Sequence, residues 1–166
     1  MKRTDRAGLK VLSRQECLDR LAGAAIGRVG FHAAALPVVL PVVFAVDGDS
    51  VVFATRAGSK LESAIRDAVV AFEADDFEPV EGAGWSVAVT GYATEVVAPD
   101  GPARLKGSSL GRWADHADAR FFRVSLEIMS GREGQVFAAR PPVDVTESHT
   151  GVVFLVGDHA TPRRPR

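Results

Sequence analysis

The hydrophobic pattern of this chain starts with a short amphipathic helix and then changes to the period of β-strands. Ser13 and Glu16 are spaced as in a capping box, where each side chain accepts a hydrogen bond from the other residue's backbone N–H. Apolar residues at positions 17, 18 and 21 recur at helical spacing, so we expect a helix from Ser13 to about Ala24. From Ile26 the period changes to two, which predicts β-strands.

A β-hairpin is expected next. Residues 36–46 and 50–55 are apolar runs joined by Asp47-Gly48-Asp49, and an Asp-Gly turn between such runs is typical of a hairpin. Pro37 and Pro41 have no N–H to donate to a central ladder. The first strand of this hairpin should therefore have a solvent-facing edge, a bulge, or a stretch of backbone that faces a ligand.

The remaining pattern predicts more strands and short helices. A second capping box, from Ser59 to Glu62, predicts a helix to about Asp67. A polar loop should extend to Gly84, and residues 99–119 should form a helical or irregular crossover. The expected strands are 69–74, 85–97 and 120–128, the last ending at 130–132, with another candidate at 151–156. This set indicates a mostly β protein with short helices: a small, mostly antiparallel barrel of six or seven strands, in which the long strand 85–97 bends.

Composition and charge narrow the class of protein. With 166 residues, 46% of them hydrophobic, the chain suits one folded domain, expected over residues 1–140, and a C-terminal extension over 141–166. The formal net charge of -1 argues against nucleic acid or an anionic membrane surface as the main partner. The longest apolar run, residues 36–46, is too short to span a bilayer, and the polar N-terminus does not resemble a signal peptide. A single cysteine, Cys17, excludes an internal disulfide, and we expect a cytoplasmic protein.

The segment Thr55-Arg56-Ala57-Gly58-Ser59-Lys60 is the main candidate for a ligand site. It lies between the end of a strand and the start of a helix, where unpaired N–H groups disfavour cations. An anion would reverse this effect for Arg56 and Lys60, and a phosphate would also engage the hydroxyls of Thr55 and Ser59. The alternative is that Ser59 only caps the helix while both cations extend into water.

Taken in order, these features resemble the FMN-binding split barrel proteins of the pyridoxamine 5′-phosphate oxidase-like superfamily, and among them the small actinobacterial type. The resemblance runs from about Ser13 to Arg132 and rests on six motifs: LSRQECLDRLA, IGRVGF, PVVLPVVFAVDGDSVVFAT, GSKL, WSVAVTGYATEV and FFRVSLEIMSGR. It implies an antiparallel split β-barrel of six to seven strands. It also implies FMN as cofactor and a flavin-dependent oxidoreductase that acts on an unknown small acceptor.

The resemblance further implies which residues contact the flavin. The backbone of Pro41, Val42 and Val43 would face the isoalloxazine ring. The residues implied to hold the FMN phosphate are Thr55, Ser59 and Lys60, with assistance from Arg56. Without the resemblance, the two valines would be interpreted as ordinary core residues of a barrel.

A homodimer is implied as well, because relatives have their flavin sites in clefts between two subunits. Trp85 and Ser86 would then be offered to the flavin of the partner, and Arg132 would also reach the site. A tryptophan at the start of a strand is otherwise more often a packing residue than a ligand contact.

Two departures from the family pattern narrow the activity. True pyridoxamine phosphate oxidases carry a late Arg-x-His pair that grips the substrate, and no such pair occurs in this chain, so vitamin B6 oxidation is not expected. Relatives that resemble nitroimidazole reductases usually have a histidine where this chain has Thr55, which argues against that activity. The alternative is that the chain is a non-catalytic protein of the same fold, which binds FMN, a 5-deazaflavin coenzyme or haem without turnover. No catalytic acid or base can be nominated.

Two other patterns are weaker candidates. Gly107-Ser108-Ser109-Leu110-Gly111 matches the G-x-S-x-G pattern of hydrolases, but that motif needs a strand before the serine and none is expected there. His116 is flanked by Asp115 and Asp118, yet no second histidine lies at ligand spacing, so we do not expect a metal site.

Overall fold

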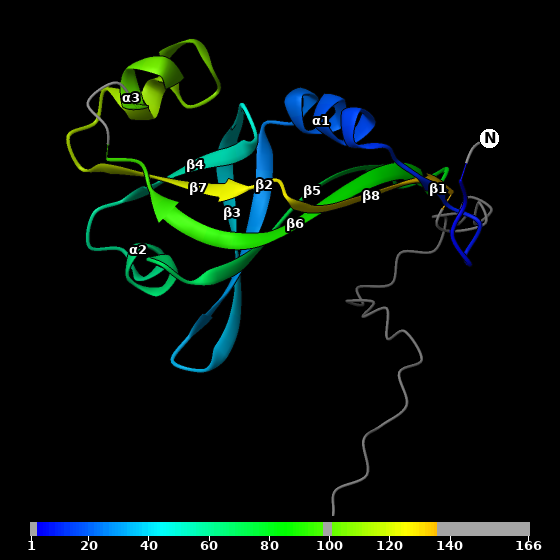
Figure 1. The fold of residues 1–166 in the computed structure, drawn as a ribbon, viewed down its shortest axis with the longest axis horizontal. Helices are drawn as coiled ribbons and strands as arrows, with labels where there is room; N and C mark the ends of the chain where they lie inside the picture. Colours follow the sequence, from blue (N-terminus) through cyan, green and yellow to red (C-terminus); the bar gives the residue numbers. More distant parts are fainter. Residues whose placement is uncertain (1–2, 98–100, 136–166) are drawn as a thin grey trace, which may run out of the picture.

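The structure of the protein is a computed structural model that describes residues 3–97 and 101–135 (Figure 1). The helices are α1 (Arg14–Gly23), α2 (Lys60–Ile65), α3 (Gly101–Arg104) and α4 (Gly111–Ala114), with a 3₁₀ turn η1 (Leu105–Gly107). The strands are β1 (Lys10–Val11), β2 (Ile26–Ala33), β3 (Leu36–Asp47), β4 (Ser50–Arg56), β5 (Val69–Glu78), β6 (Ala83–Glu95), β7 (Ala119–Ser125) and β8 (Ile128–Gln135). The expected domain boundary at residue 140 and the candidate strand 151–156 lie outside the described residues.

The strands form one antiparallel sheet that closes on itself. Their order is β1-β8-β6-β5-β2-β3-β4-β7, and an additional pairing of β6 with β7 closes the six strands from β6 to β7 into a barrel. β6 makes this possible because it pairs first with β8, through Ala83–Thr90, and then with β7, through Ala93–Glu95. Gly91 lies at the change of partner, where a Cβ would come within 3.1 Å of Val124. The mostly β barrel and its bent long strand, as predicted from the sequence, are confirmed.

Several predicted elements differ in length from the observed ones. β5 continues to Glu78, through a stretch expected to be a polar loop, because residues 75–78 pair with residues 83–86 of β6. Arg28 of β2 pairs with Glu73 at 3.1 Å and with Asp75 at 2.6 Å, which supports this acidic edge of the strand.

The second helix and the last strand also differ from the predicted elements. α2 ends at Ile65 rather than at about Asp67, and Glu62 accepts a hydrogen bond from Gly58 N–H instead of completing a capping box with Ser59. The region expected as a single strand over 120–128 consists of β7 and the first residue of β8, separated by a bend at residues 126–127, so Arg132 lies inside β8.

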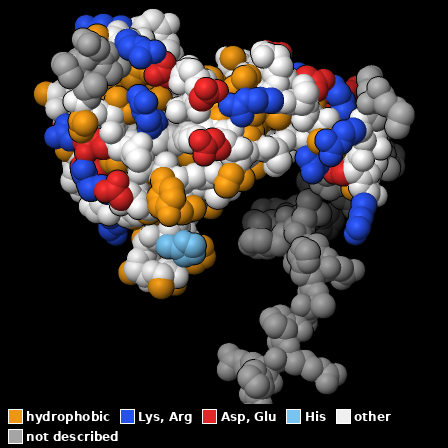
Figure 2. Space-filling view, in the orientation of Figure 1, with side chains coloured by type: hydrophobic (Ala, Val, Ile, Leu, Met, Phe, Trp, Pro, Cys, Tyr) orange, Lys and Arg blue, Asp and Glu red, His pale blue; other side chains and the backbone are white. Residues whose placement is uncertain are grey.

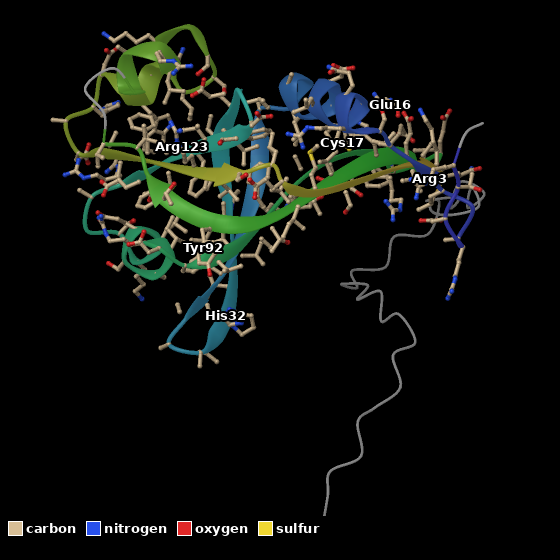
Figure 3. The ribbon with its side chains drawn as sticks, in the orientation of Figure 1. Arg3, Glu16, Cys17, His32, Tyr92 and Arg123 are labelled. Carbon is tan, nitrogen blue, oxygen red and sulfur yellow. The ribbon has the colours of Figure 1, made fainter. Side chains whose placement is uncertain are left out.

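The main core fills the barrel and continues beneath α1. Phe44, Phe53, Phe72 and Phe122 are almost completely buried in it. Cys17 points from α1 toward the sheet, as Figure 3 shows, and burial raises the pKa of its thiol. Cys17 is therefore a small buried residue of the helix.

The capping box of α1 leads to a prediction about acid stability. Hydrogen bonds from the Lys10 ammonium and the Ser13 N–H lower the pKa of Glu16 from 4.5 to about 2. Since the folded state holds this proton less tightly than the unfolded state, the ionised carboxylate stabilises the fold above pH 4.5, and this contribution is lost as the pH falls toward 2.

We therefore expect Glu16→Gln to lower the free energy of unfolding at neutral pH and to lose less stability between about pH 5 and about pH 3. Urea melts across this range would measure both effects. Parallel stability profiles for the variant and the native protein would show that Glu16 contributes nothing to the acid response.

Candidate functional site

The site begins where β3 and β4 separate. The β2–β3 hairpin turns at Ala34 and Ala35, which have φ values of 49° and 67°, as a two-residue type I′ turn requires. The closing pair of such a turn, here Ala33 and Leu36, is hydrogen-bonded in both directions, and hydrogen-bonded pairs then alternate along the ladder. Even-numbered residues of β3 therefore bond to β2, and the N–H and C=O groups of odd-numbered residues point away from it.

This register explains the two prolines and leaves the N–H of Val43 unpaired among the described strands. Pro37 and Pro41 occupy odd positions, so neither removes a bond to β2. The pairing of β3 with β4 ends at Phe44 and Phe53, so the N–H of Val43 lies just beyond the last pair. Between residues 36 and 43 the second edge of β3 is unpaired within the described chain. The prediction of an open backbone edge on this strand is confirmed.

The loop after β4 brings hydroxyl groups and cations to the same place. Thr55, the last buried residue of β4, has its Oγ1 2.9 Å from the Oγ of Ser59. Ser59 caps α2 by accepting a hydrogen bond from the N–H of Glu62 at 3.0 Å. Gly58 has a φ of 74°, a left-handed conformation that turns the chain back toward Thr55.

Seven of the ten predicted site residues line one cavity of about 640 Å³. They are Pro41, Val42, Val43, Thr55, Arg56, Ser59 and Lys60, and the wall is completed by Ile26, Leu40, Ala54, Leu61 and Trp113. One end of the cavity is apolar and lies against the open edge of β3. The other end has the hydroxyl groups and the cations.

The two cations of the cavity have little compensating charge. Within the described part of the chain, Lys60 has no ion-pair or hydrogen-bond partner for its side chain. Arg56 has one carboxylate nearby, that of Asp118 at 4.0 Å, and both side chains are mostly exposed. Most other described lysines and arginines have a carboxylate closer than this. The donor set of two cations and two hydroxyls fits a phosphate group.

The other three predicted residues lie elsewhere in the chain. Ser86 and Arg132 are directly opposite each other on β6 and β8, and the Nε of Arg132 donates to Asp5 at 2.9 Å. Trp85 is 8% exposed, with the guanidinium of Arg20 5.9 Å from the centre of its ring. Trp85 lines a separate cavity of about 620 Å³ beneath α1. A role for these three residues at a flavin stays a prediction that needs a second subunit.

Sequence reasoning missed Trp113. It lies in α4, within the crossover that was expected to be helical or irregular. The available signal was a tryptophan in a polar segment, because a large apolar side chain there needs a surface to cover.

The two weaker patterns have structural explanations. Ser109 of the G-x-S-x-G pattern follows a 3₁₀ turn rather than a strand, and its hydroxyl donates to the carbonyl of Phe44. No group of three or more potential metal ligands occurs among residues 3–97 and 101–135. In the same residues no helix is long and apolar enough to cross a membrane.

Comparisons with known proteins identify the family. Residues 13–133 match the family described as pyridoxamine 5′-phosphate oxidase. The chain is 40% identical over 125 residues to the uncharacterized protein Rv0080 of Mycobacterium tuberculosis, covering 72% of this chain and 82% of that protein. The structure of the FAD binding protein from Mycobacterium smegmatis is 31% identical to this chain, with a TM-score of 0.63. The match covers 75% of this chain and 97% of that protein.

A more distant structure shares the fold alone. The FAD and heme binding protein from Mycobacterium smegmatis is 17% identical, with a TM-score of 0.64 over 78% of this chain and 75% of that one. This chain belongs to the pyridoxamine 5′-phosphate oxidase family, and the predicted resemblance is confirmed. It lacks the Arg-x-His pair throughout its 166 residues.

The register of β3 predicts losses of different size for two neighbouring proline substitutions. Val43→Pro removes an N–H that has no strand partner, so we expect a loss of less than about 1 kcal/mol in the free energy of unfolding. Val42→Pro removes an N–H bonded to Gly27 and leaves that carbonyl unpaired, which should cost about 1–3 kcal/mol. Chemical denaturation of both variants measures the difference. Equal destabilisation would contradict the assigned register.

Proposed function

We propose that this protein is a flavin-dependent oxidoreductase that binds FMN, or the FMN half of a larger flavin, in the cavity between β3 and β4. The observation that carries the proposal is that one cavity joins a phosphate-type donor set to an apolar wall with an open backbone edge. The parts of riboflavin phosphate match these features. Its flat apolar ring with a polar edge suits the apolar wall with the open backbone edge, and its anionic tail suits the phosphate-type donor set. The relative that binds FAD supports the same class of ligand.

Each part of the cavity would hold one part of the ligand. Lys60 and Arg56 would neutralise the phosphate, and the hydroxyls of Thr55 and Ser59 would donate to its oxygens. The N–H of Val43 and the C=O of Pro41 would bond the polar edge of the ring, because both face the open side of β3. The bound flavin supplies hydride acceptance at N5. The chain orients the ring and excludes water from one of its faces.

The alternative is a non-catalytic carrier of FMN, a 5-deazaflavin coenzyme or haem. No histidine lines the cavity, so the usual axial ligand of haem is missing among the described lining residues, which favours a flavin. An absorption spectrum of the purified protein, taken before and after addition of FMN, FAD, 5-deazaflavin coenzyme or haem, tests all of these ligands. Anaerobic NADH and NADPH should then bleach the flavin bands of an oxidoreductase. A yellow protein that neither nucleotide reduces would favour the carrier.

Removing the cation at the start of α2 should weaken flavin binding. A charge-assisted hydrogen bond contributes about 1.5–3 kcal/mol, so Lys60→Ala should raise the Kd of FMN about 10- to 100-fold. Lys106→Ala is the matched control, because Lys106 lies outside this cavity and pairs with Asp115 at 3.5 Å. Fluorescence titration measures both constants. An unchanged Kd for Lys60→Ala would refute the phosphate assignment.

A homodimer forms part of this proposal, and the outer face of the sheet is the surface that would support it. Val39, Gly30, Ala71, Thr90 and Ile128 follow one another in register across five strands. Residues directly opposite each other share a face of the sheet, so these five form one row on the outside of the barrel. Val39 is 63% exposed and Ile128 67% exposed.

A second apolar pair, Val69 and Tyr92, lies in the next row of the same face and is also exposed. Figure 2 shows apolar side chains gathered over the projecting β2–β3 hairpin and the sheet beside it, and Figure 3 labels His32 on that hairpin and Tyr92 above it. Such a flat apolar face is typical of an interface between subunits. Ser86 and Arg132 lie on the same face, so a second copy packed there could receive them.

A charge placed in the middle of this face should separate the subunits. Ile128→Glu is expected to give a monomer in sedimentation velocity and a weaker flavin complex, because each site would lose the residues of the partner. Val97→Glu is the control, since Val97 is 81% exposed but follows the end of β6 away from this row. A dimeric Ile128→Glu variant would contradict the assigned face.

A further inference from the structure

A second and smaller cavity adjoins the phosphate end of the first one. It has a volume of about 110 Å³ and is lined by Arg56, Arg112, Trp113, His116 and Asp118. Arg56 and Trp113 line both cavities. The crossover between β6 and β7 therefore places one arginine, a histidine and an indole next to the proposed phosphate site, where Arg56 from the end of β4 also lies.

The basic groups of this small cavity differ from the other basic residues of the crossover. Arg104 pairs with Asp47 at 3.0 Å, and Lys106 pairs with Asp115 at 3.5 Å. Arg112 has no such partner in the described part of the chain. Asp118 is the one carboxylate lining the cavity, and it lies 4.0 Å from Arg56. With a neutral His116 the lining still carries a formal excess of positive charge, which favours an anion.

The wall that carries these groups is firmly packed. Leu105, Leu110 and Phe121 are buried in a satellite core against β3 and β4. The N–H of Trp113 bonds the carbonyl of Leu110 at 2.9 Å, and the rings of Trp113 and His116 meet edge to face with centroids 6.4 Å apart. The side chains of the crossover therefore have a defined position beside the larger cavity.

We propose that the small cavity receives the second phosphate of a flavin dinucleotide, with Arg112 as its main cationic contact. The inference rests on the proposed function, because it requires the first phosphate to lie at Lys60 in the adjoining cavity. A volume of 110 Å³ equals the space of about four liquid waters, which is enough for one phosphoryl group. The adenosine then extends past Trp113, toward the solvent side of α4.

Titration of the flavin-free protein with FMN and with FAD tests this assignment. We expect FAD to bind about tenfold more tightly than FMN, because it alone reaches Arg112. Arg112→Ala should remove this preference and leave the Kd of FMN within about twofold of the native value. Asp118→Asn should tighten FAD binding, since it removes a carboxylate from the cavity. Arg104→Ala removes the same charge from the same crossover outside both cavities and should change neither constant.

The outcomes separate this inference from the function on which it rests. Equal affinities for FMN and FAD in the native protein would overturn the inference, and so would an Arg112→Ala variant that still binds both ligands but has weakened affinity for both by the same factor. In either case FMN binding would still support the proposed function. Failure of both flavins to bind the native protein would overturn the proposed function itself. FMN binding by each variant also reports that the variant is folded.

Discussion

Beyond Phe44 and Phe53 the strands β3 and β4 leave one another, and the rest of the site depends on this separation. One short turn and the end of one ladder determine what is exposed there. The turn at Ala34 and Ala35 directs the odd-numbered amides of β3 away from β2, and the end of the β3–β4 ladder leaves the N–H of Val43 without a strand partner. If the β3–β4 ladder continued past this pair, the N–H of Val43 would be bonded to β4. The barrel thus obtains a polar backbone edge in an otherwise apolar wall without burying an unpaired group in its core.

The β4–β7 ladder adds a second constraint, because it brings distant segments to the phosphate end of the cavity. Thr55 lies opposite Arg120 and Arg56 opposite Ala119, and the N–H of Ala57 bonds the carbonyl of Asp118. The loop that leads into α2 and the crossover that ends at β7 are therefore tied together. The charged side chains of both segments therefore lie near the phosphate end of the cavity, although about sixty residues separate the two segments along the chain.

The sequence predicted most of the first segment and little of the second, for physical reasons. Alternating apolar positions, a capping serine and prolines in a strand are local signals, and they located the barrel, the hydroxyls and the open edge. The crossover has no such signal: α4 has four residues, and its placement depends on the burial of Leu110 against β3 and β4. Tertiary packing determines where Arg112, Trp113 and His116 lie, and the hydrophobic periodicity of the sequence does not predict these positions.

The pleat of β6 also limits what the proposed dimer can do. Adjacent residues of a strand point to opposite faces, so Trp85 and Ser86 cannot both lie on the outer face. Ser86 shares that face with Ile128 and Arg132, whereas Trp85 packs beneath α1 with Arg20. The guanidinium of Arg20 also pairs with Glu133, which holds Trp85 on the inner side. A partner bound at the outer face would therefore meet Ser86 and Arg132 directly, and Trp85 could act on its flavin only through the position of the β6 backbone.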